Sequence, residues 1–291
     1  MFDWDDLRVF LAAARTGSLA GAGERLRVDA ATVGRRVARL ESALKSTLVI
    51  RSPAGLQLTA AGAQLLEIAL DAETAMLAAA HVARPDVVAG TVRISTAEGF
   101  GTAVLAPALP RLVELYPGLK VELAANASFL SASRREVDMT VTLSAPDTTR
   151  LIVEALAPYQ LALYASREYL ARAGAPRSIA ALPDFQIVGY VEDLIFAPEL
   201  RYLDEILPGL KPTMASSSIQ AQRAMVLAGG GIGVLPAFMS EDLVRVLDSV
   251  MLERRLWLST HRDVHDTARM RAVRRWLRDL AQGAEARLMA A

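Results

Sequence analysis

The N-terminal segment carries apolar side chains at the intervals of short helices. Apolar positions recur every three or four residues and predict a first helix: Trp4, Leu7, Phe10, Leu11 and Ala14. We expect this helix to end at Gly17, and Ser18 to cap a second helix that continues to about Leu26. Asp29 can cap a third. Three short helices joined by tight turns match a helix-turn-helix.

The third helix, in the stretch "VDAATVGRRVARLESAL" (28–44), has two different faces. One side of its helical wheel is apolar and should be buried: Val33, Val37, Leu40 and Leu44. Thr32, Arg35 and Arg39 project from the opposite side, with Ala31 beside them and Arg36 on the flank. A helix that enters the major groove needs small residues near its start, arginines and an apolar back. The alternative is an ordinary helix with a solvated basic face.

The residues around this helix favour DNA binding. The following stretch "STLVIRSPAGLQLT" has two short apolar runs around a Ser-Pro-Ala-Gly turn, which predicts a β-hairpin or wing. Residues 24–51 contain seven basic side chains against three acidic ones, a local excess of positive charge. A helix-turn-helix with a wing and such a charge is typical of a DNA-binding domain.

Thr59 can cap a long helix rich in alanine and leucine, which should stop near Pro85. Its apolar positions recur at intervals of three to four: Leu65, Ile68, Ala69, Ala72, Met76 and Ala79. A helix of about 25 residues is ~40 Å long. It either packs on its own domain or pairs with a second copy of the chain. We favour pairing, because a helix-turn-helix usually binds a two-fold site as a dimer.

From Gly90 onward the chain alternates between strand and helix patterns, which predicts an α/β domain with a parallel-rich sheet and crossover helices. The predicted strands are "TVRIS", "LKVELAAN", "VDMTVTL", "LALYAS", "FQIVGYV", "GIGVLP" and "RRLWLST", and "ARMRAVRRWLRDLAQ" is a closing amphipathic helix with a solvated arginine face.

Two strand-to-helix turns carry hydroxyl groups. Ser95 and Thr96 follow the first strand, and Ser216, Ser217 and Ser218 precede a later helix. Hydroxyls beside the free N–H groups of a helix start form an anion site, and ligands of open α/β sheets bind at the carboxyl ends of strands. A cleft between two such turns would hold a small carboxylate or similar polar molecule. The alternative is that these residues only cap helices.

The remaining motifs give weaker evidence for a function. The run "AGGGIG" (228–233) closes a helix before a strand, the reverse of a dinucleotide fingerprint, and predicts a helix end with a tight turn. His261 and His265 are four residues apart without a third ligand, so we predict no metal site and interpret them as surface or capping residues. No P-loop or nucleophile elbow is present, and we predict no enzyme activity, no catalytic residue and no cofactor.

The amino-acid composition limits which functions are possible. The net charge is zero, so any attraction for nucleic acid must be local. The chain has no cysteine, which excludes disulfides, thiolate catalysis and cysteine zinc sites. The acidic start "MFDWDDLRVF" is unlike a signal peptide, and no apolar run is long enough to span a membrane. We therefore expect a cytoplasmic protein without a membrane partner.

Nearly the whole chain resembles the LysR-type transcriptional regulators. The resemblance lies in "DLRVFLAAARTGSLAGAGERLRVDAATVGRRVARLESAL", the wing "LVIRSPAGLQLTAAG", "RREVDMTV", "AMVLAGGGIGVLP" and "LWLSTHRD". It implies a winged helix-turn-helix, a dimerising linker helix and an effector domain of two lobes like periplasmic binding proteins, usually in a tetramer. We accordingly divide the chain into the DNA-binding domain (1–58), the linker helix (59–84), effector lobe 1 (90–161 plus 263–291) and effector lobe 2 (162–262).

This chain departs from the family pattern at the start of the third helix. Family members commonly have Ser-Gln-Pro or Ser-Gln-Ala where it has Asp29, Ala30 and Ala31, and Ser where it has Gly34. The base-contacting glutamine is missing, whereas the arginine is kept as Arg35. In the wing, Ala54 replaces a common Arg, and Leu48-Val49 replaces Leu-Phe. The resemblance therefore implies DNA binding but no particular base preference.

The candidate site residues follow from the helix face and the resemblance. Those for double-stranded DNA are Ser18, Ala31, Thr32, Arg35, Arg36, Arg39 and Arg51. Those for a small effector, expected to be polar or anionic, are Ser95, Thr96, Asn126, Phe129, Ser217, Ser218 and Gly230. The rival hypothesis is a small-molecule-binding protein or enzyme built on the α/β part, with the N-terminal segment serving only assembly.

Overall fold

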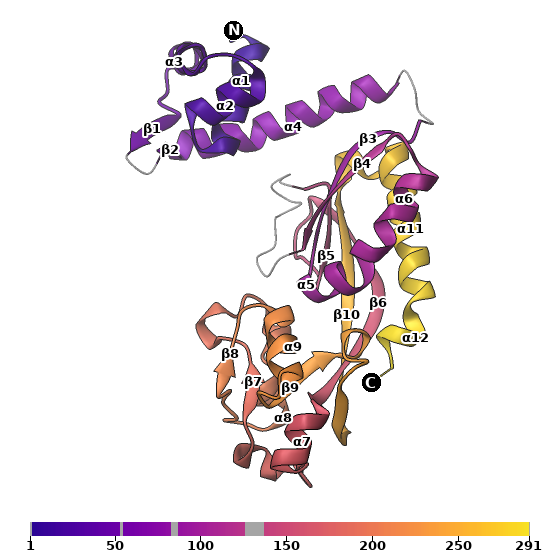
Figure 1. The fold of residues 1–291 in the computed structure, drawn as a ribbon. Helices are drawn as coiled ribbons and strands as arrows, with labels where there is room; N and C mark the ends of the chain where they lie inside the picture. Colours follow the sequence, from indigo (N-terminus) through magenta and orange to yellow (C-terminus); the bar gives the residue numbers. More distant parts are fainter. Residues whose placement is uncertain (1, 53–54, 83–86, 126–136, 291) are drawn as a thin grey trace. The chain divides into compact units, whose positions relative to one another are not determined.

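The computed structural model describes residues 2–52, 55–82, 87–125 and 137–290 (Figure 1). The chain forms two compact units, Met1–Pro85 and Asp86–Ala291, and each is described by itself.

The N-terminal unit consists of helices and one hairpin. Its elements are α1 (Trp4–Thr16), α2 (Leu19–Leu26), α3 (Ala30–Leu44), β1 (Val49–Ser52), β2 (Gly55–Leu58) and α4 (Ala60–Val82). The two strands pair antiparallel from Val49 opposite Leu58 to Ser52 opposite Gly55. The predicted three helices, wing and long helix are all confirmed.

The helix starts are capped by the side chains expected from the sequence. The Ser18 hydroxyl accepts from the Gly21 N–H at 3.0 Å, and the Asp29 carboxylate accepts from the Thr32 N–H at 2.7 Å. The Thr59 hydroxyl accepts from the Gly62 N–H at 3.0 Å. Each side chain satisfies one of the N–H groups that a helix start leaves without a partner.

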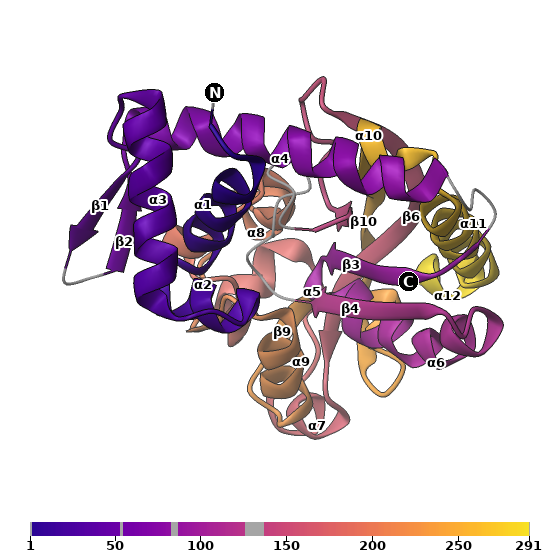
Figure 2. The same cartoon turned by 90° about the horizontal axis from the view of Figure 1, so that it is seen from above.

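The core of the N-terminal unit lies among α1, α3 and the start of α4 (Figure 2). It buries the predicted apolar seam of α3 at Val33, Val37 and Leu40. On α4, Ala69 and Leu70 pack into this core, whereas Ile68 and Met76 are more than half exposed. α4 therefore packs part of its apolar surface on its own unit, and it leaves in solvent Ile68 and much of Met76, which borders the contact with α1.

The C-terminal unit is built on one eight-stranded sheet in the order β4-β3-β5-β10-β6-β9-β7-β8. Its strands are β3 (Gly90–Thr96), β4 (Leu119–Ala125), β5 (Met139–Thr142), β6 (Leu151–Ala165), β7 (Ile187–Gly189), β8 (Met214–Ala215), β9 (Ile232–Pro236) and β10 (Val244–His261). Its helices are α5 (Glu98–Phe100), a π-helical turn (Gly101–Leu105), α6 (Ala106–Leu115), α7 (Arg167–Ala173), α8 (Tyr202–Ile206), α9 (Ile219–Leu227), α10 (Arg262–His265), α11 (Ala268–Gly283) and α12 (Glu285–Leu288).

The sheet has two parallel ends joined by an antiparallel centre. β3 pairs parallel with β4 and β5 at one end, and β7 pairs parallel with β8 and β9 at the other. The long strands β6 and β10 pair antiparallel with each other and run through both ends (Figure 1). We call the part with β3, β4, β5, α5 and α6 the β3 half, and the part with β7, β8, β9 and α7–α9 the β9 half.

The structure differs from the sequence prediction mainly in these two connecting strands. The patterns "LALYAS" and "RRLWLST" predicted only short strands, but β6 begins at Leu151 and β10 at Val244. β10 carries register shifts between Val246 and Met251 and between Leu256 and Trp257. Such bulges break the two-residue alternation, which is the pattern that identifies a strand in a sequence.

The closing helix α11 also differs from its prediction. Its apolar positions Met270, Val273 and Leu277 are fully buried, as expected. Arg274, predicted to lie on a solvated face, is itself buried and contacts the imidazole of His265. The reason is its position one turn after the buried Met270, which places Arg274 at the edge of the buried face and toward His265 of α10.

Candidate nucleic-acid interface and effector cleft

The first turn of α3 holds a connected set of polar side chains. Asp29 accepts from both the N–H and the hydroxyl of Thr32, each at 2.7 Å. The Arg35 guanidinium then donates to the Thr32 hydroxyl at 3.0 Å. These bonds to Thr32 lower the pKa of Asp29 below its ordinary value. The network orients Thr32 and Arg35 at the exposed start of the helix.

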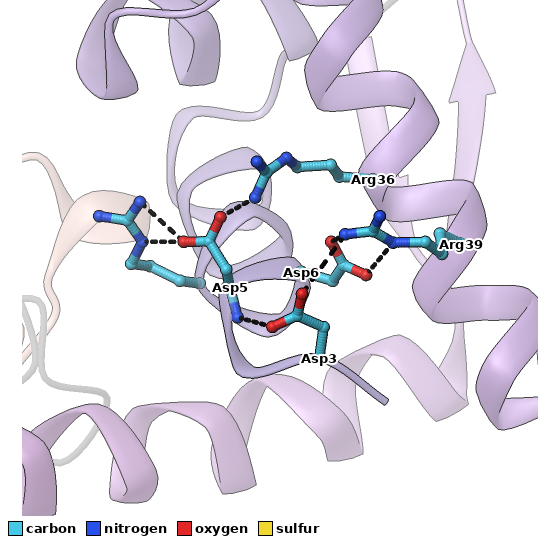
Figure 3. Close-up of polar contacts among 6 residues, drawn as sticks. Asp3, Asp5, Asp6, Arg36 and Arg39 are labelled. Carbon is cyan, nitrogen blue, oxygen red and sulfur yellow. Dashed lines mark hydrogen bonds and ion pairs between the residues drawn. The ribbon is translucent and has the colours of Figure 1, made fainter. Parts of the chain in front are cut away.

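The other two arginines of α3 face acids at the start of α1 (Figure 3). Arg36 forms an ion pair with Asp5. Arg39 binds Asp6 through two nitrogens, and its Nη2 lies 3.6 Å from Asp3. The hydrogen bond to Asp6 raises the pKa of Arg39. These two cations are thus partly neutralised by the chain's own carboxylates, whereas Arg35 forms none of the ion pairs found in the described residues.

The remaining predicted DNA-binding residues occupy three different places. Ser18 caps α2 and is half-buried, while Ala31 is exposed in the first turn of α3. Arg51 lies in β1, but its side chain is outside the described residues. The roles assigned to these residues remain predictions.

Sequence reasoning missed the contacts that attach the wing to the helices. The Glu41 carboxylate on α3 accepts from the N–H groups of Leu48 and Val49 at 2.7 and 3.1 Å. The Leu56 N–H donates to the Gly17 carbonyl at 2.8 Å. These long-range bonds fix the hairpin against α3 and against the α1–α2 turn, and an acid at the end of a helix gives no sequence pattern for such a role.

A cavity lies between the two halves of the C-terminal unit, with about 510 Å³ of empty space including its opening to solvent. Its walls are mostly apolar and aromatic: Ala97, Gly99, Phe100, Leu143, Tyr159, Leu161, Tyr190, Phe196, Leu200, Tyr202, Ile219, Pro236, Phe238 and Leu256, with Glu98 and Ser217. The residues come from α5 in the β3 half, from the start of α9 in the β9 half, and from both connecting strands.

The structure brings only part of the predicted effector set to this cavity. Ser217 lines it, and Ser218 caps α9 beside it. Ser95 and Thr96 are fully buried within β3 and are not among the lining residues. Gly230 lies in the turn between α9 and β9, also away from the lining. Asn126 and Phe129 lie outside the described residues.

The start of α9 is already occupied by an acid that the sequence analysis did not single out. Glu98 on α5 accepts from the Ser218 hydroxyl at 2.8 Å and from the Ile219 N–H at 2.9 Å. Gln220 of α9 donates to Thr102 in the π-helical turn, and Ser144 donates to Glu199 at 2.5 Å. These bonds join the β3 half to the β9 half. The only sequence signal was an acid shortly after the predicted first strand.

Aromatic pairs form much of the cavity wall. The rings of Tyr159 and Phe238 meet edge to face with centroids 6.0 Å apart, and those of Tyr190 and Tyr202 are 5.9 Å apart. Burial raises the pKa of all three tyrosines. Their hydroxyls are therefore neutral hydrogen-bond donors at physiological pH.

The weaker motifs behave as ordinary structure. Gly229 ends α9 with a φ of +79° and β9 begins at Ile232, which confirms the predicted helix end and turn. His261 caps α10 by accepting from the Asp263 N–H, and His265 contacts Thr260 and Arg274. Within residues 2–52, 55–82, 87–125 and 137–290, no cluster of three potential metal ligands occurs. No helix among the described residues is long and apolar enough to cross a membrane.

Two family descriptions match the chain, one for each unit. Residues 4–63 match "Bacterial regulatory helix-turn-helix protein, lysR family", and residues 85–282 match "LysR substrate binding domain". The Mau operon transcriptional activator of Paracoccus denitrificans is 26% identical over 283 residues, which cover 96% of each chain. The regulator CrgA of Neisseria meningitidis is 28% identical over 251 residues, covering 82% of this chain and 81% of that protein.

Solved structures agree with this relationship. The structure of CrgA has a TM-score of 0.59 at 25% identity and covers 96% of this chain and 99% of its own. ArgP from Mycobacterium tuberculosis has a TM-score of 0.74 at 20% identity, and the match covers 97% of this chain and 98% of ArgP. This likeness supports the fold alone. The chain belongs to the LysR-type transcriptional regulators, which join a helix-turn-helix DNA-binding domain to an effector-binding domain.

Proposed function

We propose that α3 of this regulator enters the major groove, with Thr32 and Arg35 contacting bases and Arg36, Arg39 and Arg51 contacting mainly phosphates. The observation that carries this assignment is the network at the start of α3, in which Asp29 and Thr32 orient a guanidinium that has no ion pair among the described residues. Oriented arginines at the start of a recognition helix suit guanine edges. Ser18, at the start of α2, and Ala31, in the first turn of α3, remain further candidates for close approach to DNA.

A gel-shift titration on the promoter DNA beside its own gene tests the assignment. Arg35→Ala should cost ~1–3 kcal/mol of specific binding and relax sequence choice at one position. Arg36→Ala should weaken binding to all sequences alike and flatten the salt dependence. Arg167→Ala, on the exposed start of α7, is the charge-matched control and should change neither. Unchanged binding by Arg35→Ala combined with Arg39→Ala would remove α3 from the interface.

We also propose that two copies pair through α4. The support is the apolar surface that α4 leaves in solvent, with Ile68 62% exposed and Met76, at the border of the contact with α1, 56% exposed. Two-fold pairing suits a helix-turn-helix, which binds half-sites in pairs. Replacing both residues by Asp should lower the mass in sedimentation equilibrium, while Ala63→Asp, at an exposed position roughly 140° around the helix from both, should not. A tetramer formed from two such dimers would appear as twice the dimer mass in the same experiment.

The regulatory signal is proposed to be a small effector in the cavity between the β3 and β9 halves. Its binding would change how the halves approach each other, and it must favour one state over the other to change DNA binding. The turns with Ser95, Thr96, Ser217 and Ser218 led us to expect a polar or anionic effector, but only the α9 turn reaches this cavity. We assign the protein a regulatory role and no enzymatic reaction, in line with its curated relatives.

A further inference from the structure

The cavity of the C-terminal unit has an unusual charge balance for a site that would take an anion. Its lining contains one ionisable acid, Glu98, and no Lys, Arg or His within the part of the chain that the structure describes. A buried anion needs a cation or several hydrogen-bond donors. The lining offers mainly apolar surface instead, so a carboxylate that entered would lose its hydration and meet no positive partner.

An anion could bind at the start of α9, where Glu98 already accepts from one backbone N–H and one hydroxyl. Its Oε1 accepts from the Ser218 hydroxyl, and its Oε2 accepts from the Ile219 N–H. The bond joins residues 121 positions apart in the sequence. An acid from the β3 half therefore occupies the position where an effector carboxylate would otherwise bind the β9 half.

A second observation points to the ligand's polar group. The Tyr202 side chain lines the cavity, is only 1% exposed, and its hydroxyl forms no hydrogen bond of normal geometry among the described residues. The Tyr190 hydroxyl lies close enough for a weak hydrogen bond that affects the pKa of both phenols, and this contact leaves most of the hydrogen-bonding capacity of Tyr202 unused. A buried hydroxyl without a partner is costly and is normally satisfied by a ligand or water.

We propose that the cavity takes a small uncharged ligand with an aromatic or aliphatic body and one hydrogen-bonding group, and that Glu98 excludes carboxylates by holding the anion position of α9. This inference rests on the proposed effector role of the cavity. The ring pairs Tyr159–Phe238 and Tyr190–Tyr202 contact the body of the ligand. The Tyr202 hydroxyl bonds its polar group.

Matched aromatic probes test the proposal on the full chain. Benzamide, benzoate and benzylamine have the same ring and differ mainly in the charge of the polar group. Binding is measured by calorimetric titration and by the shift in melting temperature. The wild-type protein should bind benzamide at least about tenfold more tightly than benzoate, because two carboxylates in a low-dielectric site repel. Benzylamine should also bind more weakly than benzamide, because its ammonium group loses its hydration in the apolar cavity and the Glu98 charge is already stabilised by two hydrogen bonds.

Variants of Glu98 reverse the preference if the proposal holds. Glu98→Ala frees the start of α9, and benzoate should gain about tenfold relative to benzamide. Glu98→Gln keeps the side-chain shape and should show a smaller gain in the same direction, which covers the case that the alanine variant does not fold. Glu168→Gln, an exposed acid in the first turn of α7, is the control and should leave the ratio unchanged. Tyr202→Phe should weaken benzamide and leave toluene unaffected.

Three results would overturn the proposal: equal or tighter binding of benzoate or benzylamine by the wild type, no binding of any probe, or an unchanged ratio in both Glu98 variants. Gel shifts on the same samples separate this question from the proposed function. Wild-type protein that prefers benzamide but fails to bind DNA would contradict the proposed DNA contacts alone. Wild-type protein that binds DNA but prefers benzoate would contradict only the assignment of the ligand.

Discussion

Arg39 and Asp6 form an ion pair whose two members differ sharply in burial. Arg39 Nε lies 2.5 Å from Asp6 Oδ2, and a second nitrogen contacts the other oxygen. The Arg39 side chain is 58% exposed, whereas that of Asp6 is 2% exposed. The pair links α3 to the start of α1. Because only the acid is buried, removing the arginine and removing the acid have different consequences.

Replacing Arg39 by Ala should destabilise the N-terminal unit strongly. The change leaves the buried Asp6 carboxylate without its cation, and an unpaired buried charge is more destabilising than the loss of an exposed ion pair. Equilibrium unfolding in urea measures the loss. Asp6→Asn combined with Arg39→Ala should recover much of it, because the neutral amide is cheaper to bury.

Arg36→Ala provides the comparison for that experiment. Its partner Asp5 is 37% exposed and can be hydrated when the arginine is lost. We expect a change within about 1 kcal/mol, as for other exposed pairs. Equal losses for Arg36→Ala and Arg39→Ala would contradict the role given to the burial of Asp6.

The acids of α1 should also restrain DNA binding. Asp5 pairs with both Arg36 and Arg8, so Asp5→Asn releases two cations near the proposed interface. We expect tighter binding to DNA of any sequence and a steeper dependence of log K on log salt, by roughly one unit for each new phosphate contact. Fluorescence anisotropy at several salt concentrations measures both quantities. Asp184→Asn, an exposed acid of the C-terminal unit, should leave the slope unchanged.

Much of the N-terminal unit could be predicted from sequence because its rules are local. Helix periodicity, the caps Ser18, Asp29 and Thr59, and the hairpin pairing of β1 with β2 each depend on a few neighbouring residues. The pairing of Arg39 with Asp6 could not be predicted in this way. The two residues are 33 positions apart, and only the packing of α3 on α1 brings them together. A helical wheel of α3 places Arg39 opposite the apolar face, but it carries no information about α1, the helix that supplies Asp6.

The cavity of the C-terminal unit was also hard to predict, because residues far apart in the sequence form it. The hydroxyls near Ser95 and Ser218 have the same local pattern, yet the first turn is buried inside β3 and the second faces the cavity. Ser95 is buried because β3 lies between β4 and β5, and the long strands β6 and β10 could not be recognised at full length since β10 carries bulges. Glu98 gains its role only when these strands bring α5 to the start of α9.

Gly62 permits a close approach between α4 and the wing. A Cβ at this position would lie 2.0 Å from the Leu48 carbonyl oxygen, which is backbone and cannot move aside. That carbonyl also accepts from the Thr59 N–H at 3.0 Å, just before α4 begins. Gly62→Ala should therefore destabilise the N-terminal unit by about 1–3 kcal/mol, the usual cost of overpacking. An isolated helix would instead gain stability from alanine.

Gly283→Ala is the matched control for Gly62→Ala in thermal unfolding. Gly283 is the last residue of α11, and a Cβ there would meet no atom within 4 Å. The variant should be neutral or more stable by up to about 1 kcal/mol. A Gly62→Ala protein as stable as the wild type would contradict the close approach between position 62 of α4 and the Leu48 carbonyl oxygen.

His265 should make the C-terminal unit less stable in mild acid. Burial, and next the charge of Arg274, lower the pKa of His265 below its ordinary value of 6.5, while Asp266 and Glu154 oppose the shift. The folded protein then binds fewer protons than the unfolded chain once the pH falls below 6.5. The stability contributed by neutral His265 is thus present above that pH and is lost as the pH falls toward the folded-state pKa.

Urea unfolding at about pH 7.5 and pH 5.5 measures this loss. His265→Gln keeps a hydrogen-bonding side chain beside Thr260 but cannot take up a proton in this range. The wild type should lose more stability than the variant between the two pH values, by a modest amount because the imidazole is only partly buried. Carboxylates that titrate in both proteins cancel in the difference. The burial of the imidazole beside the charge of Arg274 would have to be abandoned as the cause if both proteins showed the same pH dependence.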